Sequence, residues 1–491
     1  NDGMLHAFTA DQSAGGQELY AFVPNGVFGN LINLTKPDYN GNHEFFVDGT
    51  PTAGDVQFSN GTWNTILVGG LRNGGKSIYA LNITNPPTST SVTESQIANN
   101  VLWEFTDSDM GQTYSRPMIG RLHDSTSSAS TPQFVAVFGS GYNNSSQTPY
   151  LYFVNAQTGA LVDKMDLCSQ ESSACDPSLP NGLSSPALLA PNGDGIVTTV
   201  YVGDLQGNLW KVDISNASPS KWSASVLFKA EGPSNQPQPI TTAPVVSLHP
   251  LYPAKQGYMV YFGTGKYLGQ QDVPNGTTTP QTQTVYGVWD QPTNGTSSTW
   301  LTRSNLQAQT LTSGTYTDSA TGAQTNVLLA TTNSVNWNTQ SGWYMDLDVP
   351  PGGGARVIKD PSLDGGRLKF TFYVPPGSSS DSCNAPGQSY LMTLNYANGG
   401  AFPAPEFDLN NDGTLNSADQ VGVPSGSQYS GNPVGVGLGQ GMSSGVIEMS
   451  GKPTKSADSG TKLIGMSSGN IVTVHERGGS LAGRMSWRQL K

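Results

Sequence analysis

The sequence predicts an all-β fold assembled from repeated antiparallel sheets, and three observations lead to this class. The first is a β-hairpin pattern at 199–213, where a β-branched and aromatic stretch is followed by a Gly-Asp-Leu-Gln-Gly turn and then by alternating apolar and polar residues. Weaker copies recur at 65–83, 134–155, 259–289 and 462–475. Part of another hairpin occupies 4–23.

The second observation is a proline motif that repeats in step with the hairpins. Short openings end at Pro51, Pro117, Pro186 and Pro244, about 60 to 70 residues apart. Proline is tolerated as the first residue of a strand, because its missing N–H breaks no ladder bond there, so each opening is expected to precede a strand. About seven four-stranded units are predicted. A closed ring, the β-propeller, would bury their faces and protect their edges.

The third observation is the composition. The 491 residues include 59 Gly and 33 Pro, and only 12% are charged, which suits an all-β protein with many turns. No amphipathic helical run of useful length and no transmembrane segment is evident. Because the repetition continues without a linker, a single domain over 1–491 is expected. The net charge of −12 argues against nucleic acid or an anionic membrane as a partner and favours cation binding.

The cysteines and the start of the chain bear on its compartment. Cys168 and Cys175 lie in one polar loop that can close as a disulfide, which would indicate an oxidising compartment, whereas Cys383 has no local partner. The chain has no signal peptide. Its first three residues have the composition of a hairpin turn whose first strand is missing. We therefore expect a fragment of a longer precursor without its N-terminal region.

Several motifs match the sequence patterns of known sites but do not lie in the secondary structure that those sites require. Residues 70–77 match a P-loop, yet the following segment alternates as a strand, whereas a P-loop lysine and serine must begin a helix. Two copies of Gly-Met-Ser-Ser-Gly, at 441–445 and 465–469, match a nucleophile elbow but also continue into strand-like segments. We interpret all three as turns between strands. The five histidines lack metal-ligand spacing, and we interpret them as structural or solvent-facing.

The strongest chemical motif is the twelve-residue segment 408–419. Calcium takes six to eight oxygen ligands, and such a loop supplies them from positions one, three, five, seven, nine and twelve, with glycine at six. Gly413 is at position six, and the predicted ligands are Asp408, Asn410, Asp412, the carbonyl of Thr414, Asn416 and Asp419. An isolated, EF-hand-like calcium loop is therefore predicted as an insertion at 406–420. A plain acidic turn is the alternative.

A second segment, 192–195, resembles half of a calcium loop. Ala190 stands where the first carboxylate should be, so the segment has too few oxygen ligands for tight binding. We interpret it as an Asn/Gly turn.

Four segments carry a family resemblance: N-D-G-M-L-H-A-F at 1–8, G-D-L-Q-G-N-L-W-K at 203–211, F-G-T-G-K-Y-L at 262–268 and G-R-M-S-W-R-Q-L at 483–490. In this order they resemble the C-terminal domain of the PilY1-type type IV pilus tip adhesins, over essentially the whole chain. The resemblance implies a modified, quinoprotein-like, seven-bladed β-propeller. It also implies a calcium loop, which 408–419 matches.

The resemblance further implies a non-enzymatic role. Family members support type IV pilus assembly, oppose retraction in a calcium-dependent way, associate with minor pilins, and contribute to adhesion and twitching motility. The implied location is secreted, at the cell surface and pilus tip in association with the outer membrane, and a host or abiotic surface is a further partner. The chain contains no Arg-Gly-Asp triplet, so the integrin binding of some relatives is not carried over.

Two alternatives from other classes stay open. Quinoprotein dehydrogenases are also propellers, and 155–160 resembles their blades, but these enzymes usually place a pair of adjacent cysteines against the quinone, and this chain has no such pair. A generic extracellular binding propeller without a pilus role is the second alternative.

Overall fold

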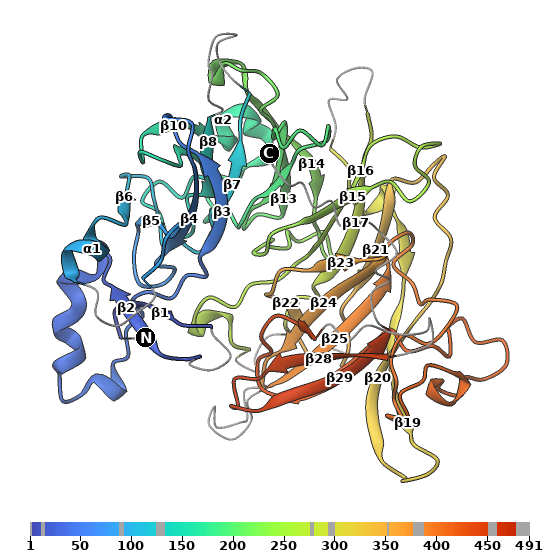
Figure 1. Ribbon diagram of the computed structural model, residues 1–491. Coiled ribbons are helices and arrows are strands. Elements are labelled where there is room, and N and C mark those ends of the chain that lie inside the picture. The colour runs from blue at the N-terminus through green and yellow to red at the C-terminus, as the bar shows by residue number, and fades with distance from the viewer. Residues whose placement is uncertain are drawn as a thin grey trace. The chain divides into compact units, whose positions relative to one another are not determined.

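The computed structural model describes residues 2–10, 15–87, 93–123, 133–274, 279–292, 300–350, 353–376, 387–449 and 459–477. The chain forms two compact units, Asn1–Leu227 and Phe228–Lys491. Both are built mainly from antiparallel strands, which confirms the all-β class (Figure 1). Over the described ranges, no helix is long and apolar enough to cross a membrane.

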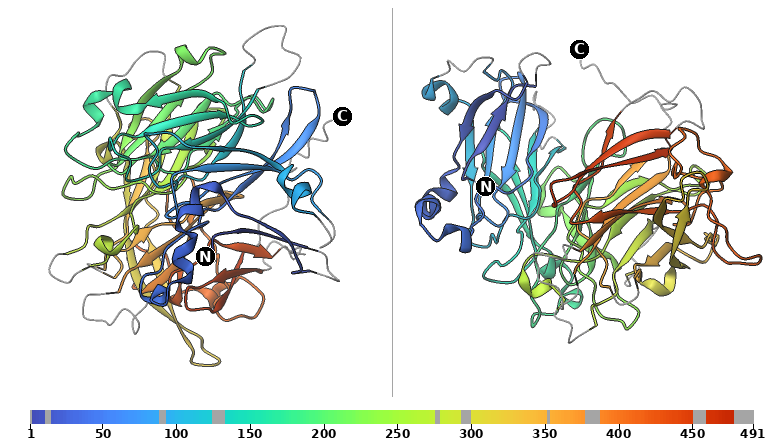
Figure 2. Two further views of the ribbon diagram at one scale, coloured as in Figure 1. Left: turned by 90° about the vertical axis from the view of Figure 1, so that its left-hand side faces the viewer. Right: turned by 90° about the horizontal axis from the view of Figure 1, so that it is seen from below.

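Unit 1 contains four sheets in its described part. The first is a hairpin of β1 (Leu5–Phe8) and β2 (Glu18–Phe22). The other three are meanders of four consecutive strands, seen from two further directions in Figure 2. Their strands are β3 (Thr52–Gln57), β4 (Trp63–Gly70), β5 (Ile78–Asn82) and β6 (Val101–Phe105); β7 (Met118–Arg121), β8 (Phe134–Gly139), β9 (Tyr150–Asn155) and β10 (Leu161–Asp166); β11 (Ala187–Leu189), β12 (Thr199–Gly203), β13 (Asn208–Asp213) and β14 (Ser223–Lys229).

Unit 2 contains three sheets among its described residues. The first has the order β15 (Val245–Leu248), β16 (Tyr258–Gly263), β17 (Thr284–Asp290), β21 (Gly342–Asp346) and β18 (Gln307–Gln309). The second has the order β19 (Leu311–Thr317), β20 (Gln324–Ala330), β26 (Gly435–Gln440), β25 (Gln388–Asn395), β24 (Arg367–Val374) and β22 (Arg356–Val357), and β23 (Ser362–Asp364) also pairs with β24. The third consists of β27 (Ile447–Met449), β28 (Ser459–Gly465) and β29 (Ile471–Arg477).

The predicted hairpins and strand entries are confirmed. The five hairpin patterns correspond to the antiparallel pairs β4–β5, β8–β9, β12–β13, β16–β17 and β28–β29. Strands β3, β7, β11 and β15 each begin at the residue after a predicted proline. The serine two positions before the proline has a repeated role, because Ser115 Oγ accepts the Gly139 N–H at 2.8 Å and Ser184 Oγ accepts the Gly203 N–H at 3.2 Å. These bonds tie the start of a sheet to the end of its second strand.

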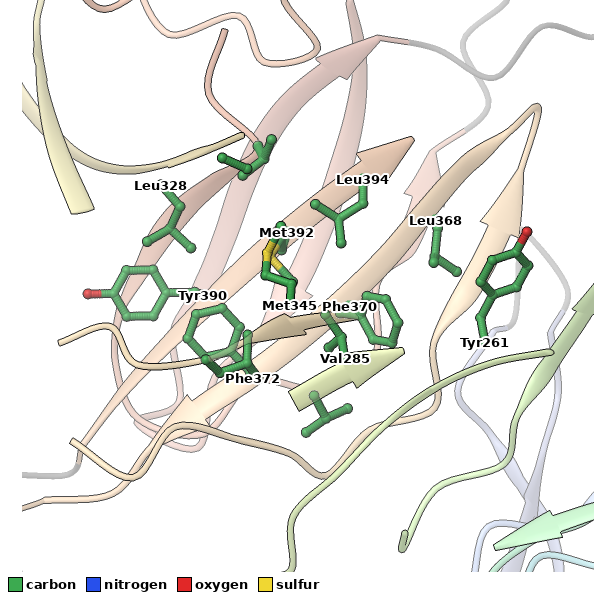
Figure 3. Packing of buried hydrophobic residues seen from close by; sticks show 14 of the residues in the cluster. Tyr261, Val285, Leu328, Met345, Leu368, Phe370, Phe372, Tyr390, Met392 and Leu394 are labelled. Carbon is green, nitrogen blue, oxygen red and sulfur yellow. The ribbon is translucent and has the colours of Figure 1, made fainter. Parts of the chain in front are cut away.

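The core of unit 2 follows the two-residue alternation of its strands. The inward residues of β24 and β25 pack together with Val285 and Met345 (Figure 3). The inward residues are Leu368, Phe370, Phe372, Tyr390, Met392 and Leu394. Because every second side chain of a strand points to the same face, the alternating apolar positions in the sequence predict this core.

The motifs interpreted as turns do connect strands. Residues 70–77 contain the end of β4 and the turn to β5, 441–445 join β26 to β27, and 465–469 join β28 to β29. The 192–195 segment is also a turn, in which Asp194 Oδ1 accepts the Ile196 N–H at 2.9 Å. A P-loop or a nucleophile elbow would be followed by a helix, but each of these three motifs is followed by a strand.

The sequence did not predict the helical segments. The longest one in the described ranges is the 3₁₀ helix η1 (Asn25–Thr35), whose Val27, Leu31 and Leu34 pack in a small core. The others are η2 (Tyr39–Gly41), α1 (Glu94–Ala98), α2 (Leu167–Gln170), η3 (Ser172–Ala174), η4 (Pro219–Lys221), η5 (Gln270–Asp272), η6 (Arg303–Asn305) and η7 (Ser417–Asp419). Most are a single turn, which is too short for a helical period to show in the sequence.

The structure contains the disulfide between Cys168 and Cys175. The bridge spans α2 and η3, and the Ala174 carbonyl accepts a hydrogen bond from Asn208 Nδ2 at 3.1 Å. The bridged loop is therefore held against the start of β13. Cys383 and the 483–490 motif lie outside the described residues.

Candidate calcium loop

The predicted calcium loop lies in the connection between β25 and β26, and its first residue is fixed to β29. Phe407 forms an antiparallel bridge with Glu476, and the Asp408 N–H donates to the His475 carbonyl at 2.9 Å. Phe407 is buried in a cluster with Val436, Leu438, Ile464, Met466 and Val474. The loop thus begins at a buried residue that is paired with β29, and Figure 1 shows β25 beside β28 and β29.

Glycine at position six is required by the backbone. Gly413 has a φ of +83°, in the left-handed region that side chains rarely adopt. A Cβ atom at this position would meet nothing within 4 Å, so the conformation, rather than lack of space, favours glycine. Asn411 also has a positive φ of 56°, which asparagine tolerates better than most residues.

The first and last carboxylates hold the loop closed. Asp408 accepts the N–H groups of Asp412 at 3.2 Å and Gly413 at 3.0 Å. Asp419 accepts the N–H groups of Leu409 at 2.8 Å and Asn416 at 2.9 Å. Asp408 is 5% exposed and Asp419 is fully buried, so both charges lie where solvent screens them little.

The middle positions lie on the exposed side of the loop. Asp412 accepts hydrogen bonds from Asn410 Nδ2 at 2.9 Å and from the Thr414 N–H and hydroxyl at 2.8 and 2.6 Å. Asn416 Oδ1 accepts the Ala418 N–H at 2.7 Å and so caps η7. All six predicted ligand positions are therefore on one ordered turn.

The electrostatics of the loop favour a cation. Burial raises the pKa of Asp419, and the negative charge of Asp408 raises it further. Hydrogen bonds from Thr414 and Asn410 lower the pKa of Asp412 and keep that exposed carboxylate ionised. Asp419 has no cationic side-chain partner within the described part of the chain. A bound cation would offset the repulsion between these carboxylates.

The donor set fits calcium in type and in order, with three carboxylates, two amide oxygens and a backbone carbonyl on one loop. The carboxylates, however, accept N–H groups of the loop. Across the described ranges, no three or more His, Cys, Asp or Glu side chains are grouped so that they could hold a metal ion. The structure therefore brings the predicted residues together on one turn but not into one coordination group.

Sequence reasoning missed a buried charge cluster at the base of the loop. Glu406 accepts hydrogen bonds from Arg367 Nε at 2.5 Å and Arg477 Nε at 3.1 Å. Lys462 Nζ lies 2.5 Å from Glu476 Oε2, and all of these side chains are largely buried. A signal was present in the sequence, because Glu476 follows Val472 and Val474 at the inward positions of β29.

Comparison with known proteins identifies the family. The sequence model of the PilY1 beta-propeller domain matches residues 1–324. The chain belongs to the PilY1 family. It is 32% identical over 525 residues to the type IV pilus biogenesis factor PilY1 of Pseudomonas aeruginosa, and 36% identical over 420 residues to a PilY1 homolog of Xylella fastidiosa.

A solved PilY1 structure has a similar fold. The crystal structure of the Pseudomonas aeruginosa PilY1 C-terminal domain aligns with a TM-score of 0.73 and 30% sequence identity, covering 96% of this chain and 91% of that one. The match with the Pseudomonas relative covers 100% of this chain and 41% of that protein. The match with the Xylella relative covers 82% of this chain and 26% of that protein. The chain therefore spans less than half the length of these curated PilY1 relatives.

Proposed function

We propose that this chain is the part of a type IV pilus biogenesis factor that binds calcium and acts at the pilus tip without catalysing a reaction. The relatives named above are type IV pilus biogenesis factors, and the similarity extends over the whole chain. In this role the protein is secreted to the bacterial surface, associates with minor pilins and the outer membrane, supports pilus assembly, and opposes retraction. Adhesion to host or abiotic surfaces and twitching motility depend on the same assembly.

The proposal includes one closed ring. The described residues form seven sheets, and three of them are four-stranded meanders of the kind expected for propeller blades. We propose that the seven sheets are the seven blades of a modified propeller over 1–491, and that 406–420 is an insertion in the β25–β26 connection.

The calcium proposal is carried by one observation, the buried pair of Asp408 and Asp419 on a loop with glycine at position six. Bound calcium would supply positive charge to these carboxylates. Because the Asp408 N–H is bonded to His475, ordering of the loop would also order its attachment to β29. The surface formed by the loop and β29 is therefore the part of the molecule that calcium would control.

Calorimetric titration of the metal-stripped protein tests the site. We expect one calcium site in the wild type and its loss in Asp412→Ala, because this carboxylate lies on the exposed side of the loop and its removal leaves the base intact. Calcium at a hundredfold excess over its Kd should raise the free energy of unfolding by about 2.7 kcal/mol. Asp194→Ala, in the acidic turn at 192–195, is the matched control and should bind normally. If Asp412→Ala binds as tightly as the wild type, 408–419 is a plain acidic turn.

The pilus role is tested separately in the bacterium that encodes the protein. The full-length gene carrying Asp412→Ala is compared with the Asp194→Ala control for surface pili and twitching at low and high calcium. The proposal expects calcium dependence to be lost in the first strain only. If both strains behave alike, pilus function does not depend on calcium binding at 408–419.

A further inference from the structure

A polar cleft opens in the second sheet of unit 2. Its volume is about 290 Å³, and it lies between β20 on one side and β25 on the other. The lining residues are Gln324, Thr325, Asn326, Gln388, Ser389, Tyr390, Gly437 and Gly439. None of these residues carries a charge, although the chain as a whole has a net charge of −12.

The cleft exists because the sheet splits at β26. Strand β26 pairs with β20 only at Val436 and Gly435, whereas its pairing with β25 continues to Gln440. The pairing of β25 with β26 shifts register between Ser389 and Tyr390, and Gly439 has a φ of +86°. Such a bulge bends a strand, so β26 follows β25 and leaves the Gln324 end of β20 without a partner on this side.

Glycine keeps the base of the cleft open. Val436 and Leu438 point into the core cluster that also contains Phe407. Gly437 lies between them and therefore faces the opposite side of the sheet. A Cβ atom at Gly437 would lie 3.4 Å from Asn326, and one at Gly439 would meet nothing within 4 Å. A ligand in the cleft can thus approach the backbone of β26.

Three carboxamides form the walls. Gln324 and Asn326 are exposed at alternate positions of β20, and their side chains have no hydrogen-bond partner among the described residues. Gln388 Oε1 accepts one long bond from the Tyr390 hydroxyl, at 3.3 Å. Each carboxamide offers two N–H donors and an acceptor oxygen side by side. This pattern complements a neutral ligand that has several neighbouring hydroxyl or amide groups.

A second cleft meets the first at Gln388, which lines both. It has a volume of about 280 Å³, shares Gln388, and is lined mainly by apolar residues that include Pro350, Val374, Pro375 and Pro376. A sugar ring has hydroxyl groups at its edge and C–H groups on its faces. The two clefts together offer hydrogen-bonding walls for the edge and apolar walls for the faces.

We propose that this pair of clefts binds a neutral oligosaccharide. Asn326, Gln324 and Gln388 hydrogen-bond to its hydroxyl groups, and Gly437 leaves room for the ring. The polar cleft is at the small end of ligand sites, which span roughly 300 to 1,000 Å³, so it holds about one or two rings. The inference deepens the proposed adhesive role and rests on that role for its biological meaning, but the binding itself requires neither calcium nor pili.

The test is titration with defined neutral oligosaccharides. Maltotetraose, cellotetraose, mannotetraose and N-acetylchitotetraose are titrated into the protein with calcium and after its removal, and binding is followed by calorimetry and saturation-transfer NMR. We expect at least one of them to bind under both conditions. Gln388→Ala should weaken that binding by about tenfold, since several hydrogen bonds are lost. Gly437→Val should abolish it, because the added side chain enters the cleft.

The control is Asn30→Ala, which removes an exposed carboxamide of η1 and should leave binding unchanged. Circular dichroism and calcium titration of each variant report on folding independently. If none of the four sugars binds, or if binding survives both Gln388→Ala and Gly437→Val in folded protein, the inference is wrong. If an uncharged extended peptide binds in the cleft and none of the four sugars does, the cleft is a peptide site and the saccharide proposal fails. Loss of calcium binding alone leaves the sugar result unchanged, so the two proposals fail separately.

Discussion

Two buried aspartates in this protein are accommodated in different ways. Asp204, in the turn between β12 and β13, is completely buried and accepts five hydrogen bonds. The donors are Asn181 Nδ2, Asn208 Nδ2, Trp210 Nε1 and the N–H groups of Gln206 and Asn208. Asp419 is also completely buried, but it accepts two backbone N–H groups and lies near the charge of Asp408.

The difference shows two ways to stabilise a carboxylate inside a protein. Burial raises the pKa of both residues. The hydrogen bonds at Asp204 act in the opposite direction, although its pKa stays raised. At Asp419 backbone N–H groups also lower the pKa, but the neighbouring charge of Asp408 raises it further. Asp204 is therefore surrounded by neutral donors, whereas Asp419 lies near a second carboxylate, and the calcium proposal rests on that second arrangement.

The largest expected effect comes from removing the carboxylate of the hairpin. Asp204→Ala leaves several buried donors without an acceptor, so the free energy of unfolding should fall by about 3 kcal/mol or more. The loss should be the same with and without calcium. Chemical denaturation of wild type and variant under both conditions measures it, with Asp194→Ala as the control. A loss that disappears when calcium is added would remove the distinction between the two aspartates.

The base of the candidate calcium loop should give the next largest effect. Glu406→Gln keeps the shape of the side chain but removes the charge that faces Arg367 and Arg477. Two largely buried guanidinium groups then lose their carboxylate, and we expect a destabilisation of about 2 kcal/mol together with weaker calcium binding. Denaturation and calorimetry on the same variant measure both quantities. Glu171→Gln in unit 1 serves as a glutamate control. Unchanged calcium affinity in a destabilised Glu406→Gln protein would show that the base does not control the loop.

The sequence predicted the repeated parts of the fold better than the irregular ones. The hairpins and the strands after Pro51, Pro117, Pro186 and Pro244 follow from two-residue alternation and from proline chemistry, which are local properties. The placement of the six candidate ligand positions of 408–419 on one turn could also be predicted, because they lie within one loop, whereas calcium binding by them stays a prediction. The approach of Asn181 to Asp204 from outside the hairpin could not be predicted, and neither could the charge cluster at Glu406, whose partners Arg367 and Arg477 come from separate strands. The split of β26 from β20 depends on a bulge that no residue pattern marked.

The smallest expected effect is the pH dependence of calcium binding. The folded pKa of Asp419 lies above its ordinary value of 3.8. In the metal-free protein this raised pKa lowers stability at neutral pH, and the penalty is relieved as the pH falls through the folded pKa. Calcium needs the ionised carboxylate, so its affinity should fall over the same range, by up to about tenfold per pH unit below that pKa. Calorimetry from neutral pH into the acidic range measures the slope. Asp419→Asn provides the comparison, because it should fold without the penalty and bind calcium poorly at every pH. A wild-type affinity that does not fall as the pH is lowered through the acidic range would show that the N–H groups of Leu409 and Asn416 keep Asp419 ionised.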